Sequence, residues 1–80
     1  MSKENIQKRI LSLQEDIARE RERLSKDTAT TKEKIRKATS ASDKASLQKM
    51  LLSRSEQHKH TIARLQESIQ RAREEYKRMK

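Results

Sequence analysis

The two histidines are the residues that most suggest chemistry, and they stand together in the stretch His58-Lys59-His60. On a helix, residues two positions apart point roughly 200° apart, so the two imidazoles cannot share one metal ion on one helix face. His58 falls on a stripe of apolar residues, at the level of Leu24 if the chain folds back on itself. His58 either forms a polar layer that the helix interface tolerates or, if partly buried, acts as a pH-sensitive switch. The pattern predicts no metal site.

Other catalytic groups are not arranged for a reaction. The serines lie in no Gly-rich loop, since the chain contains no Gly and no Pro, and no strand-to-helix turn presents a nucleophile. Neighbouring acids such as Glu15–Asp16 and Glu74–Glu75 fall on solvated positions. The absence of cysteine excludes a disulfide or a thiolate metal site. We therefore predict a protein that is not an enzyme, with no catalytic residue and no cofactor.

Seven basic residues gather around the middle of the chain: Lys32, Lys34, Arg36, Lys37, Lys44, Lys49 and Arg54. If the chain turns there, they meet at one tip and could bind phosphates non-specifically through counterion release. No aromatic side chain interleaves them for base stacking, and no recognition-helix pattern supports sequence-specific reading. The alternative is a solvated turn. We favour it because acidic residues are interspersed almost everywhere, although the formal net charge is +9.

The elements that position these groups are two long amphipathic helices. A chain of 80 residues with 30% hydrophobic and 41% charged residues cannot fill a globular core, but it can bury one stripe along a helix. The lack of Gly and Pro favours long helices. Apolar positions in the first half begin with the 4-3-4 spacing of coiled coils and then slip at Glu20 and Arg21, whereas those of the second half keep a regular rhythm to Met79.

The stretch ATSASD, residues 38–43, is where we expect the chain to turn. It interrupts the stripe and offers N-caps, of which Ser40 with Asp43 resembles a capping box, although Ser42 or Asp43 could also cap. A fold-back near residue 41 pairs Leu13 with Ile69 and the polar layers with each other. The sequence predicts an all-α antiparallel coiled-coil hairpin in one unit, residues 1–80, with a helix over about 3–38, a turn over about 39–43 and a helix over about 44–79. The alternative is one continuous helix about 115 Å long.

A single hairpin of this size is a weak fold, so we expect it to associate further. A second seam could form from residues that flank the main stripe, namely Leu11, Ala18, Met50, Leu52 and Ala63. We predict a homodimer forming a four-helix bundle, with a monomer or a helical protein partner as alternatives. The residues predicted to carry the interface are Ile6, Ile10, Leu13, Ile17, Leu24, Ile35, Leu51, Ile62, Leu65, Ile69 and Tyr76.

No apolar run is long enough for a signal peptide or a membrane span, so we expect a cytoplasmic protein without a membrane partner. The heptad rhythm still runs at Met79, and no residue there signals a helix stop. The chain either ends in a frayed helix or is the front piece of a longer protein.

The stretch KIRKATSASDKASLQKMLLSRSEQHKHTIARLQESI, residues 34–69, resembles coiled-coil hairpins in bacterial multi-domain proteins. In those proteins a Lys/Ile-rich helix, a short connection and a second basic helix precede an effector domain, for example a TIR-like domain. The resemblance implies an oligomerisation or partner-docking segment and transfers no catalytic residue. Our functional hypothesis is therefore a non-enzymatic coiled-coil module. The alternative is a small basic nucleic-acid-binding accessory protein that uses the hairpin tip.

Overall fold

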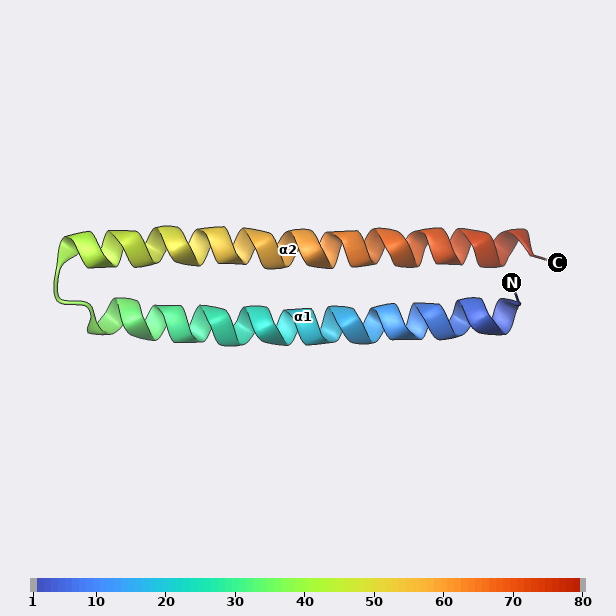
Figure 1. The fold of residues 1–80 in the computed structure, drawn as a ribbon, viewed down its shortest axis with the longest axis horizontal. Coiled ribbons are helices and arrows are strands. Elements are labelled where there is room, and N and C mark those ends of the chain that lie inside the picture. Colours follow the sequence, from blue (N-terminus) through green and yellow to red (C-terminus); the bar gives the residue numbers. More distant parts are fainter. Residues whose placement is uncertain (1, 80) are drawn as a thin grey trace.

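The computed structural model describes residues 2–79, and they form two helices. Helix α1 covers Lys3–Lys37 and helix α2 covers Ala41–Arg78. The helices lie side by side and antiparallel, with both chain ends at one end of the molecule and the connection at the other (Figure 1). The chain thus forms the predicted all-α helical hairpin, with overall extents of 62 × 15 × 12 Å. No helix within residues 2–79 combines the length and apolar character needed to cross a membrane.

The connection is shorter than the predicted turn over residues 39–43. Helix α2 already begins at Ala41, because Ser40 is its N-cap and the Ser40 hydroxyl accepts a hydrogen bond from the Asp43 backbone N–H at 3.0 Å. The expected Ser40–Asp43 cap is therefore present, and the first turn of α2 forms directly behind it. Helix α1 starts in the same way, with Ser2 capping the Asn5 N–H at 3.1 Å.

The chain leaves α1 without a glycine because no residue of the connection needs a left-handed backbone. Ala38 is extended, with φ −66° and ψ 137°, and its N–H still donates to the carbonyls of Lys34 and Ile35. No residue in the described range has a positive φ. The glycine that usually follows a helix is required only by the left-handed C-cap, which this turn does not use.

Contacts between the helices fix their register. Near the open end, the Gln7 amide donates to the Tyr76 hydroxyl at 3.3 Å and Arg9 pairs with Glu75. Nearer the connection, the Arg54 guanidinium lies 3.4 Å from an Asp27 carboxylate oxygen. In each pair, the two residues lie about equally far from residue 41 along the sequence, and residue 41 is the fold-back point that the sequence predicts.

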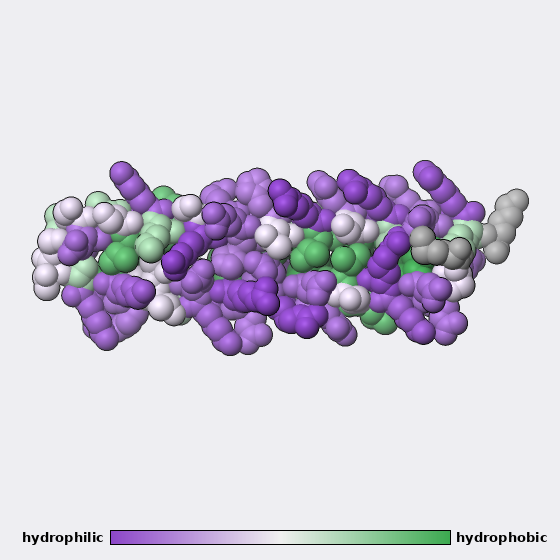
Figure 2. Space-filling view, in the orientation of Figure 1, coloured by the Kyte–Doolittle hydropathy of each residue, from purple (hydrophilic) through white to green (hydrophobic). Residues whose placement is uncertain are grey.

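The buried apolar residues are concentrated at the open end. Ile6, Ile17, Ile69 and Ala72 are the buried hydrophobic side chains of the described range. Figure 2 shows hydrophobic surface between the helices in that half and a smaller group near the connection, with a hydrophilic zone between them. The hairpin therefore has an apolar core in one half and a polar interior in the middle.

Candidate functional site

The hydrophilic zone is built around His58, which α2 points at α1. The His58 Nδ1 atom lies 2.5 Å from a Glu20 carboxylate oxygen, and Nε2 lies 3.0 Å from an Asp27 carboxylate oxygen. Glu20 and Asp27 are seven residues apart, two turns of α1, so their carboxylates flank the imidazole on either side of the level of Leu24. His58 thus lies at the level that the fold-back predicts, but it bonds the neighbours of Leu24.

Two arginines complete what we call the His58 cluster, in which positive and negative groups alternate. Arg23 lies 3.4 Å from the second Glu20 oxygen, and Arg54 lies 3.4 Å from the second Asp27 oxygen. Every carboxylate oxygen of the cluster therefore has a cationic partner. The Glu20 residue is only 9% exposed, so this pairing is what makes its burial tolerable. Among the described residues, no buried side-chain polar atom lacks a hydrogen-bond partner.

The geometry favours the charged form of His58. An ionised carboxylate can only accept a hydrogen bond, and only the imidazolium carries a proton on each ring nitrogen, so the charged form is the one that can donate to both carboxylates. The hydrogen bonds to Asp27 and Glu20 accordingly raise the pKa of His58 above its ordinary value. The hydrogen bond from His58, aided by Arg54, lowers the pKa of Asp27.

The His58 cluster favours a protonated imidazole but does not have the shape of a metal site. Its carboxylates lie against opposite ring nitrogens, so the three side chains do not converge on one point. No group of His, Asp and Glu side chains in residues 2–79 is arranged to hold a metal ion. The second histidine, His60, is exposed.

The predicted interface residues divide into two groups by burial. Ile6, Ile17 and Ile69 are buried against the other helix of the same hairpin. The others remain half-buried: Ile10, Leu13, Leu24, Ile35, Leu51, Ile62, Leu65 and Tyr76. One hairpin alone therefore leaves most of its stripe partly in contact with water.

The predicted second seam does not lie on one side of the hairpin. Its large side chains are exposed, by 59% for Leu11, 40% for Met50 and 68% for Leu52. Met50 and Leu52 are two residues apart on one helix and so point to nearly opposite sides. The five flanking residues cannot form one continuous apolar seam.

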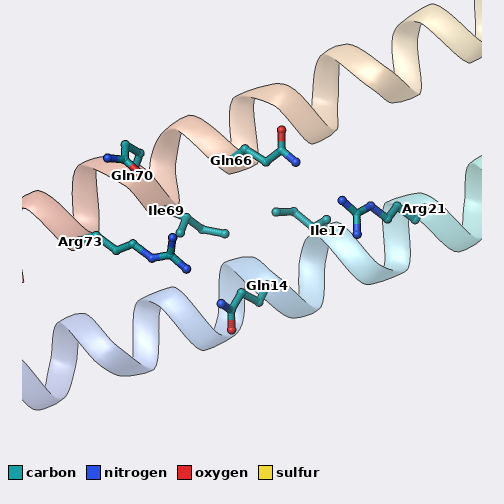
Figure 3. Close-up of a pocket in the computed structure, with 7 residues that line it drawn as sticks. All are labelled: Gln14, Ile17, Arg21, Gln66, Ile69, Gln70 and Arg73. Atoms are coloured by element: carbon teal, nitrogen blue, oxygen red, sulfur yellow. The ribbon is translucent and has the colours of Figure 1, made fainter.

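The two grooves between the helices differ in charge. One side carries acidic and basic residues together, and we call it the mixed-charge face; its grooves are lined by Arg9, Leu13, Asp16, Arg19, Glu20, Arg23, Thr61, Leu65, Ser68 and Arg71. The other side has a groove of about 410 Å³ lined by Gln14, Ile17, Arg21, Gln66, Ile69, Gln70 and Arg73 (Figure 3). A further hollow beside it is lined by Gln7, Ile10, Arg73, Tyr76 and Lys77. No acidic residue lines either hollow, so we call this pair of hollows the carboxylate-free face.

The basic residues near the connection are partly neutralised. Arg36 and Lys37 pair with Glu33 within α1, and Arg54 belongs to the His58 cluster. The remaining four make no ion pair with the described residues: Lys32, Lys34, Lys44 and Lys49. The turn does bring Lys34 and Lys44 to the same end of the hairpin.

Sequence reasoning missed Glu20 and Asp27 as partners of His58. The available signal was the spacing of Ile17, Glu20 and Leu24, in which Glu20 continues the 3-4 rhythm where the apolar pattern breaks. An acid at a stripe position opposite a histidine indicates a buried ion pair as readily as a phase slip. No protein-family model, curated protein or solved structure matches this chain.

Proposed function

We propose that the hairpin is a non-enzymatic assembly module that pairs with a second copy of itself by coiled-coil packing. The observation that carries this proposal is the incomplete burial of the stripe, since only four apolar side chains of the described range are buried in a single hairpin. Half-buried Leu and Ile side chains gain stability when another helix pair covers them, at about 25 cal/mol per Å² of apolar area. A four-helix bundle supplies that cover.

The mixed-charge face is the side suited to a second copy. Leu13 and Leu65 line its grooves, and ion pairs such as Arg9–Glu75 and Arg19–Asp16 place both signs of charge beside them. In a two-fold symmetric dimer the same patch meets itself, so a patch with both signs can match positive groups with negative ones. A patch with cations alone would repel its copy.

Within a longer chain, such pairing would control the spacing of attached domains. The start of α1 and the end of α2 lie at the same end of the hairpin (Figure 1). Parallel hairpins would therefore bring effector domains close to each other, such as the TIR-like domain that the sequence resemblance implies, and antiparallel hairpins would hold them apart.

The test is the solution mass measured by light scattering over a range of concentrations. We expect twice the chain mass of 9.5 kDa for the unmodified protein. Ser68→Lys places a charge in the Leu13 groove and should give the monomer mass, whereas the control Gln70→Lys, on the carboxylate-free face, should remain dimeric. Both should keep their helicity. A monomer for the unmodified protein, or equal masses for the two variants, would contradict the proposal.

Nucleic-acid binding by the hairpin tip is the less supported function. Three of the seven predicted tip cations are already engaged in ion pairs with carboxylates of the same chain. These pairs reduce the charge available for phosphates, on which non-specific affinity depends.

A further inference from the structure

We propose that the carboxylate-free face is a docking site for an acidic amphipathic helix from a partner protein. It lies on the side opposite the mixed-charge face, so this inference does not rest on self-association. Four observations support it: the charge of the groove, the glutamines between its cations, the apolar side chains in and beside it, and its length.

The charge of the groove is unbalanced in a way that favours an acidic partner. Arg21 and Arg73 reach into the gap between the helices from opposite ends of the groove (Figure 3). Neither arginine, nor Lys77 in the adjoining hollow, forms an ion pair with the described residues. Opposite charges steer association and fix register, and an arginine fork matches a carboxylate with two hydrogen bonds.

The glutamines between these cations suit a partner with both donors and acceptors. Gln14, Gln66 and Gln70 line the groove, and none of their amides is hydrogen-bonded to another side chain or to the backbone in the described part of the chain. Each amide offers a carbonyl acceptor and an NH₂ donor. They can therefore bond carboxylates and amides of a polar helix face, and they do not repel it.

Apolar side chains in and beside the groove favour a helix over a phosphate backbone. Ile17 and Ile69 form the floor between the two arginines (Figure 3). Leu11 lies one turn after Gln7, so it belongs to this side, and it is 59% exposed. A helix with apolar residues at every third or fourth position would cover such side chains, whereas phosphates would not.

The length of the site matches a helix of several turns. The two hollows share Arg73 and extend from Gln7 to Arg21 along α1. At a rise of 1.5 Å per residue, these positions are about 21 Å apart, or about four turns. The partner segment would lie along the seam as a third helix.

The experiment uses a fluorescent synthetic peptide of about three heptads, with Leu at the core positions and Glu at the others. A second peptide carries Gln in place of every Glu. Binding of each to the full chain is measured by fluorescence anisotropy at low and at physiological salt. We expect the Glu peptide to bind and the Gln peptide to bind at least about ten-fold more weakly.

Matched variants locate the site. Arg21→Gln with Arg73→Gln removes two charges from the carboxylate-free face, and Arg19→Gln with Arg71→Gln removes two charges from the mixed-charge face. All four arginines are exposed, so circular dichroism should show unchanged helicity for both double variants. We expect the first pair to weaken binding about ten-fold and the second less than about two-fold, because only the first pair contacts the peptide.

Several outcomes would overturn the proposal. One is no binding of the Glu peptide, and another is equal weakening by the two double variants, which would indicate general charge attraction. A third is binding of a duplex DNA oligonucleotide, but not of the peptide, in a manner that depends on Arg21 and Arg73. Solution mass measured on the same samples separates this result from self-association, because a monomer that binds the peptide refutes only the dimer.

Discussion

At the scale of single residues, the His58 cluster makes the stability of the hairpin depend on pH. The fold raises the pKa of His58 above its ordinary value, so the stability it contributes is complete below the ordinary pKa of about 6.5. That contribution is lost as the pH rises through the raised pKa, when one ring nitrogen loses its proton and faces a carboxylate. Asp27 acts in the opposite direction, since its lowered pKa means that stability is lost only in acid.

The prediction is a melting temperature that falls as the pH rises from about 6.5 towards 9 at fixed protein concentration. His58→Gln should remove most of this dependence and lower the melting temperature near pH 6 by about 5 °C, the equivalent of roughly 1 kcal/mol lost with the charged hydrogen bonds. Thermal unfolding followed by circular dichroism measures both effects.

His60→Gln is the control for this prediction, because the second histidine is exposed and bonds none of the cluster residues. It should keep the pH dependence of the unmodified protein. If His58→Gln and the unmodified protein lose stability in parallel above pH 6.5, the imidazolium is not held by Glu20 and Asp27.

At the scale of the elements, the sequence predicts most of the hairpin. The apolar spacing indicates both helices, and the hydroxyl-rich stretch indicates the turn, because both features are local. Its details were less predictable. Helix α2 begins at Ala41, earlier than the expected residue 44 or so, since Ser40 alone is enough to cap the start of the helix. The position of a cap among Ser40, Ser42 and Asp43 depends on the backbone angles, which residue types alone do not fix.

The partners of His58 and the contrast between the two faces could not be predicted from the sequence, for a different reason. Spacing assigns residues to a stripe, but the rotation of each helix decides which flanking residues enter the interface. Polar residues such as Glu20 and Asp27 therefore appear as interruptions until a side chain from the other helix is placed against them. The absence of acids from the groove that Gln14 and Gln70 line likewise becomes visible only when the helices stand together.

The cap at Ser40 gives a test at the element scale. Ser40→Ala removes the hydroxyl that accepts the Asp43 N–H, and it should destabilise the hairpin by about 1 kcal/mol. For a chain of this size, that loss lowers the melting temperature by about 4–8 °C. Ser42→Ala is the matched control: Ser42 lies inside the first turn of α2, so its change should be neutral or slightly stabilising. Equal losses for the two variants would mean that Ser40 does not cap α2.

At the scale of the whole molecule, the uneven core predicts an uneven resistance to opening. Ile6, Ile17, Ile69 and Ala72 are buried at the open end, while Leu47 and Leu51 near the connection are only half-buried. Local opening requires less free energy where fewer apolar contacts are broken. Backbone amides should therefore exchange most slowly around residues 10–20 and 62–72, and faster beside the connection, even though the chain ends lie at the slow end.

Ile69→Val tests whether the two arms share this protection. Removing one buried methylene should cost about 1 kcal/mol and speed exchange about five-fold. Because Ile17 and Ile69 meet across the same groove, the acceleration should appear in α1 as well as in α2. Ile35→Val, at a half-buried position near the connection, should have a smaller effect. If exchange were slowest beside the connection, the stabilising contacts would lie in the turn. If Ile69→Val accelerated exchange only in α2, the two helices would open independently. The hairpin would then need a second copy or a partner helix to hold its arms together.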